Sequence, residues 1–181
     1  IGQRFAVDWI KLDKDGRPYK NDGTRNKDWF CYGTKLLAVA AGTVMDIKDG
    51  TPDNEPFKEP AVPITMANVA GNFVMLKLDN GLYVLYAHII PRTLKVKVGQ
   101  KVKPGQVLGK LGNSGNSTAP HLHFHLCVGP DMLFSQGVPY ALSKYVYLGL
   151  MDPDLKPVWG EKKEITGQMP GLDDIVEFQK E

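Results

Sequence analysis

Three of the four histidines in this chain lie at alternate positions of one short apolar run, His121-Leu122-His123-Phe124-His125. Successive side chains of a β-strand point to opposite faces, so the imidazoles would share one face and the apolar side chains the other. Imidazole nitrogen is a common zinc ligand, and a catalytic zinc site has three protein ligands and a water molecule. The run therefore predicts a strand that packs a core with one face and presents a zinc-hydrolase site with the other. The alternative is a half-buried strand whose histidines form hydrogen bonds to the backbone.

Short segments of strand type recur along the chain, and helical periodicity is weak. We predict strands at residues 5–12, 36–47 with a bend at Gly42, 72–78, 82–88, 93–98 and 107–111, and in the histidine run. Asp79-Asn80-Gly81 is a strong hairpin signal. Residues 49–63, with four prolines, are predicted to form a long surface loop, and residues 112–118 a turn-rich loop in which Asn113 and Ser114 make the turn. This pattern predicts an all-β fold: a β-sandwich or barrel-sandwich of short antiparallel strands with long loops.

Length and composition exclude several classes of protein. A chain of 181 residues fits one domain or two small ones. The net charge is only +2, without a basic run or basic-aromatic stripe, so we expect no nucleic-acid partner. No apolar run is long enough to span a bilayer. No signal peptide is visible, and because Ile1 is not an initiator Met we expect a processed or trimmed start. Cys31 and Cys127 lack the spacing of a zinc or redox motif, and we expect buried thiols.

Seven stretches of the chain carry a family resemblance when they are taken in order. They are Gln3-Arg4-Phe5-Ala6-Val7-Asp8, Val39-Ala40-Ala41-Gly42-Thr43-Val44, Gly71-Asn72, Tyr86-Ala87-His88, Lys103-Pro104-Gly105-Gln106-Val107-Leu108-Gly109, Gly112-Asn113-Ser114-Gly115 and His121-Leu122-His123-Phe124. This series resembles the lysostaphin-type (LytM-like) zinc endopeptidases that cut peptidoglycan peptides. The resemblance covers residues 3–141. We therefore predict a LytM-like peptidase domain at residues 1–150, followed by a polar C-terminal arm, residues 151–181, packed on the same domain.

The resemblance implies roles for four residues. In the family the zinc ligands are the His and Asp of a His-x-x-x-Asp motif and the second His of His-x-His, so Asp8 and His123 correspond to metal ligands. His121 corresponds to the catalytic histidine, and His88 to the other active-site histidine. The implied cofactor is zinc, and the implied partner is a peptidoglycan peptide. The implied location is extracellular or in the cell envelope of a bacterium.

The first motif departs from the family pattern at one ligand. Arg4 stands where the family has its first histidine, and arginine cannot be deprotonated in proteins, so it cannot ligate zinc. The third ligand could instead come from His125, which stands where many relatives have Glu, or from residues upstream of Ile1. Alternatively, Arg4 pairs with Asp8 and places a positive charge where zinc would lie.

These departures leave the enzyme class open between two functions. One is a zinc metalloendopeptidase-like domain that acts on bacterial cell-wall peptides with a degenerate metal site. The other is a catalytically inactive relative that binds peptidoglycan or a protein partner. A third class, a biotinyl- or lipoyl-type carrier, is disfavoured because the hairpin tip Asp79-Asn80-Gly81 lacks the lysine that such a carrier modifies.

Overall fold

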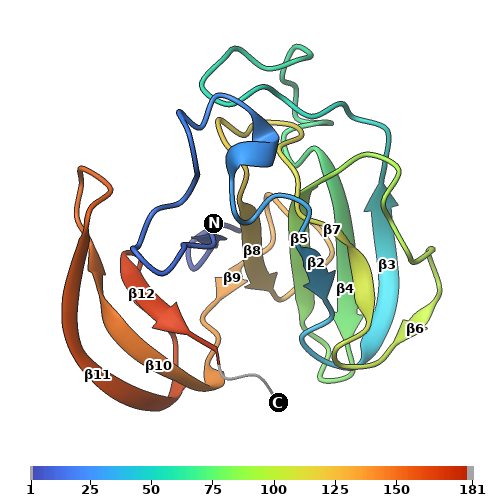
Figure 1. The fold of residues 1–181 in the computed structure, drawn as a ribbon. Helices are drawn as coiled ribbons and strands as arrows, with labels where there is room; N and C mark the ends of the chain where they lie inside the picture. Colours follow the sequence, from blue (N-terminus) through green and yellow to red (C-terminus); the bar gives the residue numbers. More distant parts are fainter. Residues whose placement is uncertain (1, 179–181) are drawn as a thin grey trace. The chain divides into compact units, whose positions relative to one another are not determined.

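The computed structural model describes residues 2–178, and its regular elements are almost all antiparallel strands, joined by long loops (Figure 1). The only helix among the described residues is a short 3-10 helix, η1, at Asn26–Asp28. The contacts divide the chain into two units: unit 1 contains residues up to Lys11 and Pro18–Val138, and unit 2 contains Leu12–Arg17 and the residues from Pro139 onward. The prediction of an all-β fold of short antiparallel strands is confirmed.

Unit 1 contains one large sheet and one small sheet. The large sheet has the strand order β1 (Val7–Trp9), β8 (Leu122–Cys127), β5 (Tyr83–Ile89), β4 (Asn72–Leu78), β3 (Gly42–Lys48) and β6 (Lys101–Val102), with β9 (Gly137–Val138) also paired to β8. The small sheet pairs β2 (Lys35–Leu37) with β7 (Val107–Lys110). The predicted hairpin at Asp79-Asn80-Gly81 is confirmed, because it joins the adjacent antiparallel strands β4 and β5. The segment 93–98 is not a regular strand.

The histidine-bearing strand β8 alternates as predicted, but both of its faces are covered along part of its length. Phe124 lies opposite Tyr86 of β5, and their rings meet edge to face at 5.3 Å. His125 lies directly opposite Leu85, so the two side chains share the face of the sheet that Phe124 does not occupy. Leu85 belongs to a buried apolar cluster on that face. The histidine face is therefore open only near His121 and His123, whereas His125 is 1% exposed.

Unit 2 is a three-stranded antiparallel sheet in the order β11 (Pro157–Gln168), β10 (Leu142–Met151) and β12 (Asp174–Glu177). The predicted boundary between the domain and its arm, at residue 150, lies within β10, and the contacts divide the chain after Val138. The residues of the predicted arm that the structure describes consist largely of strand. Its packing on unit 1 stays a prediction.

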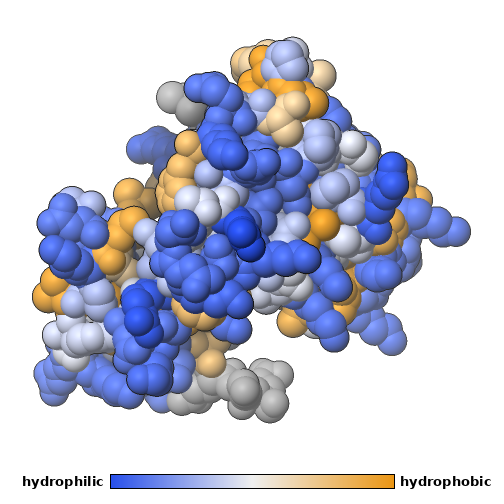
Figure 2. Space-filling view, turned by 45° about the horizontal axis from the view of Figure 1, so that its top comes forward, coloured by the Kyte–Doolittle hydropathy of each residue, from blue (hydrophilic) through white to orange (hydrophobic). Residues whose placement is uncertain are grey.

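The side of the molecule turned to the viewer in Figure 2 is mostly hydrophilic, with small separate hydrophobic patches. Among the helices of residues 2–178, none has the length and apolar character needed to cross a membrane. Cys31 and Cys127 are both buried free thiols, as predicted. Their sulfur atoms contact the backbone oxygens of Pro120 and Gly129, each at 3.1 Å.

Candidate active site

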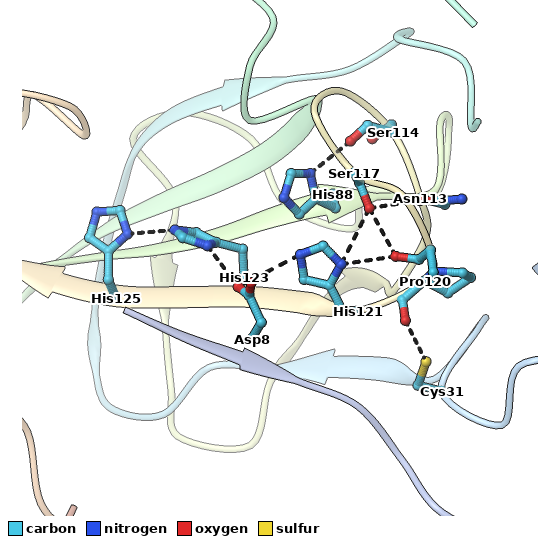
Figure 3. A network of polar contacts seen from close by, with 11 residues as sticks. Asp8, Cys31, His88, Asn113, Ser114, Ser117, Pro120, His121, His123 and His125 are labelled. Carbon is cyan, nitrogen blue, oxygen red and sulfur yellow. Dashed lines mark hydrogen bonds and ion pairs between the residues drawn. The ribbon is translucent and has the colours of Figure 1, made fainter. Parts of the chain in front are cut away.

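Asp8, His88, His121 and His123 come together on the large sheet, with His121 directly before the first residue of β8, and we call them the histidine cluster (Figure 3). Asp8 of β1 is the direct cross-strand partner of His123 in β8. His88 lies near the end of β5, which pairs with the other side of β8. The ring of His88 lies 4.6 Å from that of His121 and 6.0 Å from that of His123. The sheet therefore brings together all four residues to which the family resemblance gave a role.

His88 is held in one orientation by the loop that precedes the histidine strand. Its Nδ1 lies 2.7 Å from the backbone oxygen of Ser114. A carbonyl oxygen only accepts hydrogen bonds, so Nδ1 carries the proton and Nε2 keeps its lone pair. The backbone of His88 has φ = 61°, which is uncommon for a residue other than glycine and costs free energy. The fold thus holds a buried, strained histidine beside His121.

The loop at residues 112–118 is fastened by buried amide and hydroxyl groups. The Asn54 side-chain amide donates to the backbone oxygens of Gly115 and Ser117, both at 2.8 Å, and Ser114 Oγ donates to Ile89. The loop approaches Gly71 so closely that a Cβ there would lie 2.3 Å from the Ser114 oxygen. Ser114 therefore positions His88 as well as making the turn. The role of Asn54 was missed, because residues 49–63 carry only a surface-loop signal.

His121 presents one nitrogen to Asp8. Its Nδ1 lies 2.9 Å from the Ala119 backbone oxygen and 3.3 Å from Ser117 Oγ. The carbonyl again assigns the proton to Nδ1, which leaves a lone pair on Nε2. That Nε2 lies 3.6 Å from Asp8 Oδ1. It is therefore the atom of His121 that can accept a proton from a bound molecule.

Asp8, His123 and His125 form a chain of hydrogen bonds (Figure 3). His123 Nδ1 lies 2.9 Å from Asp8 Oδ1, and its Nε2 lies 3.0 Å from His125 Nδ1. An ionised carboxylate only accepts, so His123 donates through Nδ1 and accepts from His125 through Nε2. His125 Nε2, which is buried, then has no hydrogen bond of good geometry within the described residues. His125 thus lies on the far side of the His123 ring from Asp8.

Burial and mutual charge shape the acid-base properties of this cluster. Burial, reinforced by repulsion from His121, lowers the pKa of His88 to about 3. Burial and the neighbouring His123 lower the pKa of His125 to about 4, although the nearby Met132 backbone opposes this shift. Burial alone would raise the pKa of Asp8, but the hydrogen bond from His123 and the nearby imidazoles outweigh it, so the pKa is lowered. At neutral pH, His88 and His125 are therefore uncharged beside an ionised Asp8.

These pKa values predict a loss of stability in mild acid. A histidine in the unfolded chain titrates near pH 6.5. Below that pH, His88 and His125 become protonated in the unfolded chain, but they stay neutral in the folded protein because their pKa values there are lower. Their contribution to stability is complete above pH 6.5 and falls by up to about 1.4 kcal/mol per pH unit for each group. We expect the free energy of unfolding to drop by about 2 kcal/mol between pH 6 and pH 5. Urea titrations at the two pH values measure it.

The matched variant for this prediction is His125→Gln, which removes one of the two groups. It should reduce the drop by about half, because each buried histidine contributes independently in this range. A wild-type free energy of unfolding that is equal at pH 6 and pH 5 would contradict the assignment of both histidines as buried and neutral.

The zinc site predicted from the sequence has two of its residues, Asp8 and His123, side by side. Across residues 2–178, no three His, Cys, Asp or Glu side chains are arranged to hold a metal ion. The predicted ligands Asp8 and His123 are hydrogen bonded to each other. His125, the predicted substitute, faces away from Asp8. Arg4 is exposed, and its guanidinium carbon lies 5.4 Å from the centroid of the Phe5 ring. Within residues 2–178 the ion-pair partners of Asp8 are His121 and His123, not Arg4.

Comparisons with known proteins place this chain in a family. The model of peptidase family M23 matches residues 26–133, which include three of the cluster residues but not Asp8. Peptidoglycan DD-endopeptidase ShyC of Vibrio cholerae is 41% identical over 125 residues, 69% of this chain and 26% of that protein. ShyA of the same organism is 37% identical over 112 residues, 61% of this chain and 26% of that protein. The chain thus spans about a quarter of the length of these relatives.

Among solved structures, the catalytic domain of lysostaphin from Staphylococcus simulans matches with 25% identity and a TM-score of 0.44, over 71% of this chain and 88% of that chain. The family-model match covers more than half of the chain, and it confirms the resemblance found in the sequence. This chain belongs to peptidase family M23.

Proposed function

We propose that this chain acts on bacterial cell-wall peptides at the histidine cluster, outside the cell or within its envelope. The single observation that carries the proposal is the convergence of Asp8, His88, His121 and His123 in a chain that belongs to peptidase family M23. Two relatives that resemble it, ShyA and ShyC, are peptidoglycan DD-endopeptidases. The substrate class that we propose is therefore the peptide part of peptidoglycan.

The cluster has the groups that peptide hydrolysis needs for proton transfer. His121 Nε2 carries a free lone pair that can accept a proton from an attacking water molecule, and the Ala119 carbonyl holds the ring so that this atom faces Asp8. Asp8 is ionised and stabilises positive charge on the imidazole that receives the proton. His88 adds a second neutral acceptor, fixed by Ser114.

A second candidate function is binding without cleavage, and Arg4 favours it. The position that the family resemblance assigns to a metal ligand holds an exposed arginine, and among residues 2–178 no group of three His, Cys, Asp or Glu side chains is arranged to hold a metal ion. In this alternative the chain keeps the peptide-binding cluster and has lost hydrolysis. The two candidates share the same site and the same substrate class, so one experiment addresses both.

The experiment incubates the protein with soluble cross-linked peptides released from peptidoglycan. Binding is measured by calorimetry and cleavage by mass spectrometry. We expect binding that weakens about tenfold in His121→Ala, because one hydrogen bond to the peptide is lost. New cleavage products would support the endopeptidase, and binding without products would support the inactive relative. A wild-type protein that neither binds nor cuts these peptides would overturn the proposal.

A further inference from the structure

Charge is distributed unevenly along this chain. Between Asn80 and Pro130 there is no Asp or Glu, whereas this stretch contains Arg92 and five lysines. The stretch alone therefore carries a charge of +6, although the net charge of the whole chain is only +2. The five lysines are Lys95, Lys97, Lys101, Lys103 and Lys110. The low net charge thus conceals a strongly basic segment.

The small sheet adds Lys35 to this segment. Lys35 of β2 is the direct cross-strand partner of Lys110 in β7, and Lys95 donates a backbone hydrogen bond to Leu108 on the other side of β7. Three lysines therefore lie on three adjacent chain segments, and we call Lys35, Lys95 and Lys110 the basic strip. All three are exposed, and none of their ammonium groups forms an ion pair within residues 2–178.

The arrangement of the basic strip is unfavourable without a counterion. Like charges directly opposite each other on antiparallel strands destabilise the sheet. Here Lys35 and Lys110 occupy such a pair, and neither forms an ion pair with a carboxylate within residues 2–178. An exposed lysine ammonium binds anions as a compact, freely rotating point charge. The strip is therefore suited to a ligand that carries several negative charges along a flexible chain.

The basic strip leads directly to the histidine cluster. The backbone oxygen of Lys110 accepts a hydrogen bond from Ile90, at 2.9 Å. The next residue, Leu111, forms an isolated bridge with Ile89, and Gly112 donates to the backbone oxygen of His88, at 2.9 Å. One residue, Leu111, therefore separates Lys110 from Gly112, whose backbone contacts that of a cluster residue. The basic strip lies on chain segments next to those that carry the cluster.

We infer that the basic strip binds carboxylate groups of the peptidoglycan polymer whose peptide lies at the histidine cluster. This inference rests on the proposed function, and it adds a second contact region outside the cluster. Peptides of a polymer present carboxylates at their C-termini and acidic side chains. Each ion pair with an exposed lysine is weak. Several pairs on one polymer act together, because binding of one carboxylate raises the local concentration of the polymer's other carboxylates near the remaining lysines.

The test is cosedimentation of the protein with purified peptidoglycan sacculi from which phosphate-containing polymers have been removed. Carbodiimide amidation converts the carboxylates of half of the sample to neutral amides. We expect wild-type binding to weaken about tenfold on amidation, because several weak ion pairs are lost together. The same loss is expected for the triple variant Lys35→Gln, Lys95→Gln, Lys110→Gln on untreated sacculi. Both effects should shrink at about 0.5 M salt, where exposed charges are screened.

The matched control removes three exposed charges elsewhere, as Lys20→Gln, Lys162→Gln, Lys163→Gln. It should bind untreated sacculi like the wild type. Equal binding to untreated and amidated sacculi, or equal losses in the two triple variants, would overturn the inference. Stronger binding to vesicles of anionic lipid than to sacculi would also overturn it.

A short, carboxyl-amidated cross-link peptide separates this inference from the proposed function. The triple variant should bind it as the wild type does, because this ligand reaches only the histidine cluster. If the wild type binds the short peptide but binds untreated and amidated sacculi equally well, the inference about the basic strip is refuted and the proposed function stands. If it does not bind the short peptide, the proposed function fails.

Discussion

Replacing Arg4 with histidine should give a protein that retains about one zinc ion per chain, whereas the wild type should retain much less. The reason is the count of ligands. Asp8 and His123 lie side by side with their oxygen and nitrogen atoms 2.9 Å apart, and a protein zinc site needs at least one ligand more. The expected gain in zinc affinity is more than about 100-fold, because even groups outside the ligand shell contribute 10–100-fold.

The hydrogen-bond chain around His123 is compatible with this gain. Metal binding would require Nδ1 of His123 to lose its proton, as metal ligands generally must. The ring can then donate through Nε2 to His125 Nδ1, and His125 can donate through Nε2 toward the backbone of Met132. That rearrangement gives a hydrogen-bond partner to His125 Nε2, the nitrogen of this hydrogen-bond chain that has no hydrogen bond of good geometry. The support around His123 is thus already present in the wild type.

Elemental analysis of protein purified without added metal measures the zinc content, and competition with a chelator measures the zinc affinity. Arg4→Ala is the matched control, because it removes the guanidinium without supplying a ligand, and it should stay as low as the wild type. Stoichiometric zinc in the wild type would refute the prediction that its site is incomplete. If Arg4→His fails to bind zinc, the loss extends beyond one ligand, and the binding function gains support over the endopeptidase.

Local sequence patterns were sufficient to predict the strands that carry the histidine cluster. The run from His121 to His125 alternates between polar and apolar residues, and an alternating strand separates its side chains onto two faces whatever its neighbours are. Asn80-Gly81 fixes the β4–β5 hairpin through the positive φ that such a turn requires. Both signals lie within a few residues, so they are readable without knowledge of the tertiary fold.

Features that depend on distant contacts could not be predicted in this way. Asn54 fastens a loop 61 residues further along the chain, and nothing in its own surroundings indicates that partner. His125 was predicted to share an open face with His123, but the apolar cluster around Leu85 covers that part of the face. In β11 nearly every residue is exposed, so no alternation between buried and exposed positions marked it as a strand.

The two faces of β8 predict very different costs for truncating neighbouring side chains. Phe124→Ala should lower the free energy of unfolding by about 3–5 kcal/mol, the range for removing a buried aromatic ring from a packed core. Phe124 is 6% exposed, and its ring packs on Tyr86, whose hydroxyl is itself engaged by the backbone amide of Val39. These contacts fix Tyr86 in place, so the structure cannot close the cavity easily. Urea denaturation of the purified variant measures this loss.

His121→Ala should cost only about 1 kcal/mol, because the change opens space toward solvent and loses a hydrogen bond of ordinary strength. The side chain of His121 is 16% exposed, and its main contact is with the Ala119 carbonyl, which water can reach once the ring is gone. The pair of variants separates stability from function: Phe124→Ala should unfold at lower urea but keep the histidine cluster, whereas His121→Ala should stay folded and bind the peptide about tenfold more weakly. Equal losses of stability in the two variants would contradict this assignment of the faces, because a histidine that costs as much as a core phenylalanine must itself be part of the core.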